Sequence, residues 1–220
     1  MLGTNHKIEK NLPFLYPILN VEDHKDPLVF LDRLLEAGIT LVQLRAKTLS
    51  RSDFLSLAQH ALKLCHSAQY RAQVIINDDP ILCRESGADG VHIGQSDMPT
   101  SEARRIIGAR SILGLSTHSL TQVHDASQDT QIDYIGFGPV FTSPTKSGHA
   151  PEVGLETLHK AVKIAQHPVV AIGGISFKNA QEVYQSGPAS IAAISDLNRS
   201  DDLPATIDRY RLAYGFRPLT

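Results

Sequence analysis

The chain has 220 residues, of which 42% are hydrophobic and 20% charged. This composition is typical of a folded protein with a sizeable core and argues against disorder. The formal net charge of -2 offers no basic field for nucleic acid or an anionic membrane, and no apolar run is long enough to span a membrane. The N-terminal segment lacks the apolar stretch of a signal peptide, so we expect a cytoplasmic protein.

Apolar runs bounded by turn residues recur along the chain, and segments with helical apolar spacing separate them. The first run follows a polar leader at 1–12, which we expect to be mobile. The runs predict eight strands, at 14–19, 41–44, 74–76, 90–93, 111–116, 134–138, 169–172 and 190–194. The intervening segments predict eight helices, at 27–37, 50–66, from 80 to the turn at 87–90, and at 100–107, 119–126, 155–165, 177–185 and 204–214.

Nearly every predicted strand is apolar throughout, which is typical of a parallel sheet covered on both faces. The regular alternation favours a single-domain (β/α)8 TIM barrel at 13–220 over an open doubly wound sheet, because a closed barrel leaves no edge strands. Active sites in this architecture lie at the carboxyl ends of the strands. Polar residues that follow the strands are therefore the candidates for function.

Local signals refine some of these elements. Pro80 suits the first position of a helix, where its missing N–H costs nothing, and Asp79 before it suits a cap or turn. The segment 100–102 (Thr-Ser-Glu) offers a capping signal for the helix that ends near Ile107. The two cysteines, Cys65 and Cys83, lie in predicted helices outside any C-x-x-C pair, so buried reduced thiols are expected.

Two acids follow neighbouring predicted strands. Asp78 comes after the run at 74–76, and Asp97 follows the run at 90–93. Each alone could be a turn residue, but together at one rim they suit Mg²⁺, which usually takes one or two carboxylates and completes its shell with water and phosphate. His92 and Gln95 could lie behind or beside such a site.

Cations follow the second predicted strand. Arg45 and Lys47 have the i, i+2 spacing that sends both side chains to one side, where they could bind a diphosphate. A solvated surface pair is the alternative. Gln43 points to the same side, towards the barrel lumen, where its amide needs a core or ligand partner.

Later loops carry candidates for anion binding. The loop at 139–153 places Ser143, Thr145 and Lys146 among Gly and Pro residues, which suits an anion-binding lid or simply a polar surface loop. A glycine pair ending at Gly174 follows the seventh predicted strand, and the eighth ends at 194–195 (Ile-Ser). Loops in these positions of such barrels commonly bind phosphate through backbone N–H groups.

Taken together, these segments resemble the thiamine-phosphate synthase family. The resemblance extends from about residue 15 to residue 197, in order and without large gaps. The matching segments are VQLRAK (42–47), INDD (76–79), GADGVHIGQSD (87–97), GLSTHS (114–119), GPVF (138–141) through TK (145–146), and AIGGI (171–175). Six co-linear motifs are far more specific than any one of them.

The resemblance implies a barrel enzyme that joins an aminopyrimidine methyl diphosphate to a thiazole phosphate and releases diphosphate. It implies small-molecule substrates as partners, leaves a homo-oligomer open, and implies Mg²⁺ at Asp78 and Asp97. By the same resemblance, Arg45, Lys47, Lys146 and Ser116 are the catalytic candidates. The residues around the pyrimidine and its diphosphate would be Gln43, Arg45, Lys47, Asn77, Ser116 and Lys146, and those around the thiazole phosphate Ser143, Thr145, Gly174, Ile194 and Ser195.

Three positions depart from the family pattern. Ala46 stands where the family usually has Glu, so an orienting contact between the two cations is missing. The stretch 187–190 reads Gly-Pro-Ala-Ser instead of Gly-Ala-Asp-Gly, which could alter the turn before Ile194 and Ser195. Asp196 replaces a common Ala, and we expect its side chain to point outward, away from the phosphate.

Two other functions compete with the synthase. A thiazole tautomerase resembles the chain in fold and in several motifs, and His118 would match its catalytic histidine. A tautomerase needs no diphosphate grip and no Mg²⁺. The synthase is therefore favoured by Asn77, Asp78, Asp97, Lys47 and Lys146. A regulatory barrel that only binds a thiamine precursor ranks third, because apart from the change at Ala46 no metal or leaving-group residue is lost.

Overall fold

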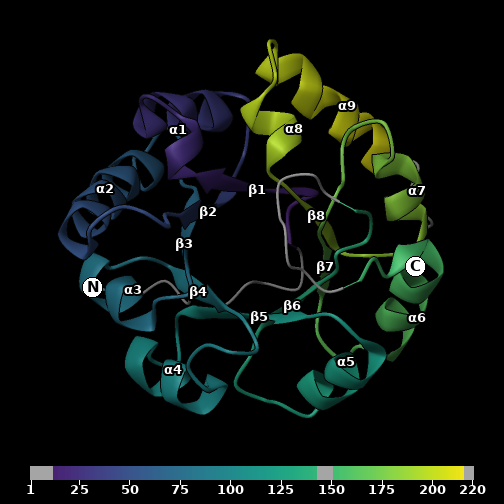
Figure 1. Cartoon of the computed structure of the whole chain (residues 1–220). Coiled ribbons are helices and arrows are strands. Elements are labelled where there is room, and N and C mark those ends of the chain that lie inside the picture. The colour runs from purple at the N-terminus through teal and green to yellow at the C-terminus, as the bar shows by residue number, and fades with distance from the viewer. Residues whose placement is uncertain (1–11, 143–150, 216–220) are drawn as a thin grey trace.

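The computed structural model describes residues 12–142 and 151–215 and shows a closed barrel of parallel strands in the order β1 to β8. Seen along the barrel axis, the strands form an inner ring and the helices an outer one (Figure 1). The predicted TIM barrel is confirmed. No helix in the described ranges is long and apolar enough to cross a membrane.

The strands and helices alternate along the chain. The strands are β1 (Leu15–Asn20), β2 (Leu41–Arg45), β3 (Gln73–Asn77), β4 (Gly90–Ile93), β5 (Ile112–Thr117), β6 (Tyr134–Phe137), β7 (Val169–Ala171) and β8 (Ser190–Ala193). The helices are α1 (Pro27–Glu36), α2 (Arg51–Cys65), α3 (Pro80–Ser86), α4 (Thr100–Ile107), α5 (Leu120–Ser127), α6 (Gly154–Ile164), α7 (Ala180–Gln185), α8 (Ser195–Asn198) and α9 (Leu203–Gly215), and a 3-10 turn, η1, spans Val21–Asp23.

Most predicted elements lie within two residues of their observed bounds. The exception is α7, which begins at Ala180 rather than at 177, because the N–H of Phe177 donates to the Asp196 carboxylate and Asn179 closes a turn onto Ser176. The short helix α8 was not predicted. The capping signal at Thr100 was wrong: Thr100 is already helical, and the preceding Pro99 makes no side-chain cap.

The barrel divides the apolar side chains into two cores. Side chains that point outward pack under the helices in one large cluster, which includes both cysteines as buried free thiols. Side chains that point inward fill the lower lumen. This inner cluster consists of Leu12, Tyr16, Ile18, Leu41, Ile75, Ile112, Tyr134, Val170 and Ala192.

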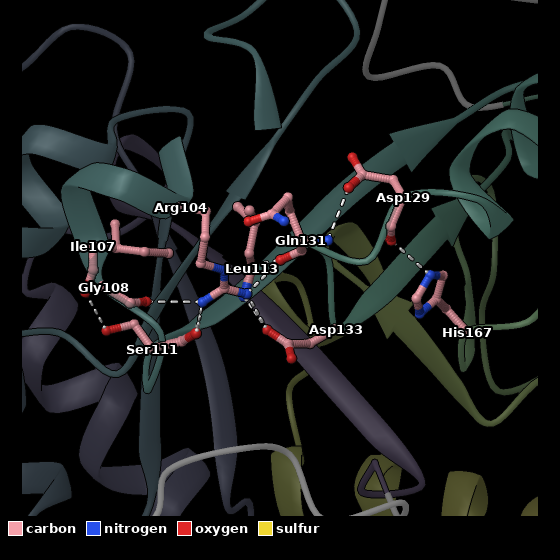
Figure 2. A network of polar contacts seen from close by, with 9 residues as sticks. All are labelled: Arg104, Ile107, Gly108, Ser111, Leu113, Asp129, Gln131, Asp133 and His167. Atoms are coloured by element: carbon pink, nitrogen blue, oxygen red, sulfur yellow. Dashed lines mark hydrogen bonds and ion pairs between the residues drawn. The ribbon is translucent and has the colours of Figure 1, made fainter. Parts of the chain in front are cut away.

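A polar clamp joins the amino ends of β5 and β6, at the bottom of the barrel (Figure 2). The Arg104 guanidinium donates to the backbone oxygens of Ser111 and Gln131 and lies 2.7 Å from the Asp133 carboxylate. The same carboxylate accepts from the N–H of Leu113 at 2.8 Å. Helix α4 is therefore tied to two strand starts by one arginine with nearly all of its donors satisfied.

The start of β4 repeats part of this arrangement, and the start of β8 lacks it. Asp89 donates its N–H to the oxygen of Val74 and accepts the N–H of Val74 on its carboxylate. Ala189 makes the same backbone bond to the oxygen of Val169 but has no carboxylate to offer. The turn at 187–190 thus makes the same backbone bond as the turn before β4, despite the sequence departure. The buried hydroxyl of Ser190 has no hydrogen-bond partner within the described residues.

Candidate active site

A cavity opens at the carboxyl ends of the strands, and its floor is the inner cluster. Five residues predicted for the site line it together: Gln43, Arg45, Asn77, Ser116 and Ile194. The remaining lining residues are Tyr16, Ile18, His92, Tyr134, Gly136, Val170, Ile172 and Ala192. Residues as far apart in the sequence as Tyr16 and Ile194 therefore meet around one space.

The end of β1 and the turn η1 hold the two cations at and after the end of β2. Asn20 Oδ1 accepts from the Arg45 guanidinium at 2.6 Å. Glu22 Oε1 accepts from the backbone N–H groups of Lys47 at 2.5 Å and Thr48 at 2.8 Å. The carboxylate of Glu22 thus supplies an orienting contact to the segment where Ala46 lacks one. Although burial acts to raise the pKa of Glu22, the hydrogen bonds from Thr48 and Lys47 lower it.

Sequence reasoning missed Asn20 and Glu22. Both follow the first predicted strand at the same rim, and the candidates came only from the loops after the later strands. Applying the rule of polar residues after strands to all eight strands would have found them.

The two predicted metal ligands lie against each other at the ends of β3 and β4. The Asp78 and Asp97 carboxyls are within hydrogen-bonding contact, and Arg45 is near enough to act on Asp78. Partial burial and then the charge of Asp97 raise the pKa of Asp78, while Asn77 and Arg45 act to lower it. Asp78 also holds a left-handed backbone, with φ 66°, and donates its N–H to the oxygen of His92. Such strain is often found at functional sites.

This donor set fits a divalent cation held jointly with a phosphate. Two carboxylates in contact at an open rim repel each other unless a proton or a cation lies between them. Asp97 is held in place by the N–H of Gly94, which donates to its Oδ2 at 2.6 Å. Within the described residues no cluster of three or more His, Cys, Asp or Glu side chains forms a cage. Mg²⁺ is the ion that commonly uses so few protein ligands.

The predicted thiazole-phosphate residues are described in part. Ser143, Thr145 and Lys146 lie outside the described residues, so their roles stay predictions. Gly174, with φ 61°, packs closely against the segment just before them: an added Cβ would lie 2.7 Å from the oxygen of Thr142. The glycine thus brings the loop after β7 against the loop after β6.

The loop after β8 places Ile194 and Ser195 beside the β7 loop, with Ile194 on the cavity wall. Asp196 points outward to the following helix α9, as expected. Its carboxylate accepts from the N–H of Phe177 and from the Tyr210 hydroxyl, both at 2.9 Å. The negative charge that departs from the family pattern is therefore used in joining α8, α9 and the β7 loop.

The structure anchors His118 away from the cavity wall. Its Nδ1 lies 2.6 Å from the carbonyl oxygen of Gly138, so Nδ1 carries the proton that is donated. Ser116, two residues earlier, lines the cavity instead. His118 therefore holds the start of the β6 loop.

The model of the family described as thiamine monophosphate synthase matches residues 15–197. The chain belongs to this family. It is 40% identical over 204 residues to the thiamine-phosphate synthase of Lysinibacillus sphaericus, covering 91% of this chain and 93% of that protein. It is 39% identical over 175 residues to the thiamine-phosphate synthase of Caldicellulosiruptor bescii, covering 80% of this chain and 78% of that protein.

A solved structure of the same family extends the likeness to the whole barrel. The thiamine phosphate pyrophosphorylase from Pyrococcus furiosus is 31% identical and superposes with a TM-score of 0.82, covering 92% of this chain and 95% of that chain. The resemblance read from the motifs of the sequence is thus confirmed. Because the chain belongs to the thiamine-phosphate synthase family, the residues that line its cavity are candidates for substrate contacts.

Proposed function

We propose that the protein is a transferase of thiamine biosynthesis that couples an aminopyrimidine methyl diphosphate to a thiazole phosphate, giving thiamine phosphate and diphosphate. The observation that carries the proposal is the contact between Asp78 and Asp97 beside Arg45, which itself lines a cavity together with Gln43 and Ser116. Acidic, cationic and amide groups meet there at one rim. Such a combination suits a diphosphate attached to a polar ring.

Loss of diphosphate is the step that needs help, because its negative charge grows as the carbon–oxygen bond breaks. Arg45, held in place by Asn20, and Lys47, whose backbone is held by Glu22, supply preorganised positive charge. Mg²⁺, held by Asp78 and Asp97, would neutralise further charge on the leaving diphosphate. Lys146 is the remaining cation that the sequence predicts for this role.

The pyrimidine ring is assigned to the lumen below the rim. Gln43, Asn77 and Ser116 present amide and hydroxyl groups there, and the inner apolar cluster closes the space beneath them. Departure of diphosphate leaves a pyrimidine methylene cation, which the ring amino group stabilises and the thiazole nitrogen captures. No protein nucleophile is needed, so enclosing this cation away from water is the main task of the lumen.

The thiazole phosphate is assigned to the opposite side of the mouth, where the loops after β6, β7 and β8 meet. Gly174 and Ser195 lie in these loops, and Ser143 and Thr145 are predicted to join them. This placement leaves the thiazole ring facing the lumen. The two substrates then approach each other across the cavity.

A thiazole tautomerase remains the second candidate, and two assays on one preparation separate it from the synthase. The purified protein is incubated with both phosphorylated precursors and Mg²⁺, and thiamine phosphate is measured by chromatography. In parallel, the isomerisation of the thiazole carboxylate phosphate is measured. We expect thiamine phosphate and no isomerisation; isomerisation without coupling under saturating substrates would contradict the proposal.

Replacing His118 sharpens the comparison. A tautomerase that uses this histidine loses its chemistry in His118→Ala. The synthase should lose only what a loosened β6 loop costs, within about tenfold. His124→Ala is the matched control, because His124 is exposed on α5.

A further inference from the structure

A row of polar groups crosses the lumen of the barrel and ends at Ser116. Gln43 Nε2 donates to the Tyr16 hydroxyl at 3.1 Å, and that hydroxyl lies 3.0 Å from the Tyr134 hydroxyl. The Tyr134 hydroxyl lies 2.9 Å from Nδ1 of His92, and Nε2 of His92 lies 2.9 Å from Ser116 Oγ. All five side chains line the cavity.

Two glycines make the room that the central ring needs. An added Cβ at Gly114 would lie 2.4 Å from Nδ1 of His92 and 2.2 Å from the Tyr134 ring. At Gly136 it would lie 3.2 Å from Cε1 of His92. The imidazole therefore occupies a niche that β5 and β6 leave open, and a residue with a side chain at 114 would displace it.

The row has a direction, because each hydroxyl carries one proton. The Tyr16 oxygen accepts from Gln43, so its own proton goes to Tyr134. The Tyr134 proton then goes to Nδ1 of His92. A neutral imidazole carries one proton, which must lie on Nε2 and is donated to Ser116 Oγ. The Ser116 proton is left to point into the cavity.

The groups of the row are neutral, so this proton count holds. The two ring nitrogens of His92 are hydrogen-bonded to the uncharged hydroxyls of Tyr134 and Ser116, so neither partner supplies a negative charge that would favour an imidazolium. Burial raises the pKa of both Tyr16 and Tyr134. Neither a charged ring nor a phenolate interrupts the sequence of donors.

We propose that His92 is a positioning residue, held as its Nε2–H tautomer by Tyr134, that makes Ser116 a hydrogen-bond donor to the pyrimidine substrate. The site then selects a ring atom with a lone pair at this position and disfavours one that carries a proton. The assignment of the pyrimidine rests on the proposed function. The tautomer of the free protein does not.

The tautomer is measured directly by NMR on the free protein with ¹⁵N-labelled histidine. The signals of His92 are assigned by their disappearance in His92→Gln. We expect a one-bond proton coupling on Nε2 and none on Nδ1. The reverse pattern would mean that the row runs from Ser116 towards Gln43, and it would overturn the inference.

Tyr134→Phe tests what sets the tautomer, because it removes the donor to Nδ1 and keeps the ring. We expect the preference for Nε2–H to weaken in this variant. An unchanged preference would overturn the role given to Tyr134. Folding is checked by the cooperativity of unfolding.

Kinetics test the consequence for the substrate. His92→Leu removes the donor to Ser116, and we expect KM for the pyrimidine diphosphate to rise about tenfold while KM for the thiazole phosphate stays within twofold. His92→Gln can still donate an amide N–H and should recover most of the loss. His124→Leu, on the outer face of α5, is the control. Equal loss for both substrates, or no rescue by Gln, would contradict a positioning role.

The two arms separate the inference from the proposed function. Failure of the proposed function shows as absent product in the wild-type protein with the Nε2–H tautomer intact. Failure of the inference shows as an Nδ1–H ring, whether or not product forms.

Discussion

The acidic residues at the two ends of the barrel differ in their partners. At the bottom, Asp133 lies 2.7 Å from Arg104 and also accepts a backbone N–H, so its charge is met on both sides. At the mouth, Asp78 lies against Asp97, and Arg45, which acts on Asp78, donates to Asn20. One end satisfies its charges within the chain, and the other leaves them for a ligand.

This difference separates the acidic residues that stabilise the fold from those that are expected to act in turnover. A fully bonded ion pair at the amino ends of the strands ties helices to strands. Burial and then the charge of Asp97 raise the pKa of Asp78, so these two acids contribute no such tie. Changes at the bottom should therefore affect folding, and changes at the mouth should affect turnover.

The largest effect on folding is expected from Arg104→Ala. This change leaves the half-buried Asp133 carboxylate without its cation and frees several backbone oxygens, so the free energy of unfolding should fall by about 3 kcal/mol or more. Denaturant titration measures it. Arg105→Ala, whose side chain is 76% exposed, should change it by less than about 0.5 kcal/mol. Equal effects of the two variants on the free energy of unfolding would contradict a stabilising role for the contacts of Arg104.

Asp78→Asn should have the opposite effect, with turnover reduced and stability kept. Asn tolerates the left-handed backbone at this position, so the variant changes mainly the charge. The free energy of unfolding should stay the same or rise, while kcat/KM should fall roughly 100-fold as the metal loses a ligand. Asp125→Asn, exposed on α5, is the control for turnover. A folding defect without loss of turnover would contradict the contrast between the two ends.

A smaller effect is expected from Glu22→Ala, which releases the backbone at Lys47 and Thr48. We expect kcat/KM to fall about tenfold, as one positioned cation is loosened. Glu22→Gln keeps an acceptor oxygen and should lose less. Glu182→Ala, exposed on α7, should have no effect.

Glu22 also predicts a pH dependence. Since its pKa is lower in the folded protein than in the unfolded chain, its stabilising contribution is present above the unfolded pKa and is lost as pH falls through the folded pKa. Subtracting the Glu22→Gln unfolding curve from that of the wild type isolates this contribution. A difference that does not change across the acid range would show that the hydrogen bonds from Lys47 and Thr48 do not depend on an ionised Glu22.

The smallest expected effect is at the start of β8. Ser190→Ala removes a buried hydroxyl without a hydrogen-bond partner in the described part of the chain, so the free energy of unfolding should rise by up to about 1 kcal/mol. Thermal unfolding measures the shift. A loss of stability would mean that the hydroxyl has a partner, such as a buried water.

The barrel could be predicted from the sequence because its strands are apolar throughout and its breaks fall at Pro and Gly. The meeting of Asp78 with Asp97 and the place of Arg45 on the cavity wall were predictable for a similar reason, because these residues lie at or shortly after the carboxyl ends of strands. Each of these signals is local. The closed topology then places their ends at one rim.

What could not be predicted depends on contacts across the barrel. The partners of Glu22 lie in another loop, and the row from Gln43 to Ser116 exists only when five strands face one lumen. The hydrogen-bond partner of Asp196 could not be predicted for the same reason, because Tyr210 reaches it from α9. Because the strands are apolar throughout, no alternation of polar and apolar residues marks which inward-pointing side chains form a hydrogen-bond network.

The most direct test of the central claim is the rate of thiamine phosphate formation as a function of Mg²⁺ concentration in the wild-type protein and in Asp97→Ala. We expect the wild-type rate to rise with Mg²⁺, to saturate, and to be abolished by a chelator. In Asp97→Ala the curve should shift to higher Mg²⁺ or vanish, while Asp125→Ala follows the wild type. Turnover by Asp97→Ala that matches the wild type at every Mg²⁺ concentration would contradict the metal site at the barrel mouth.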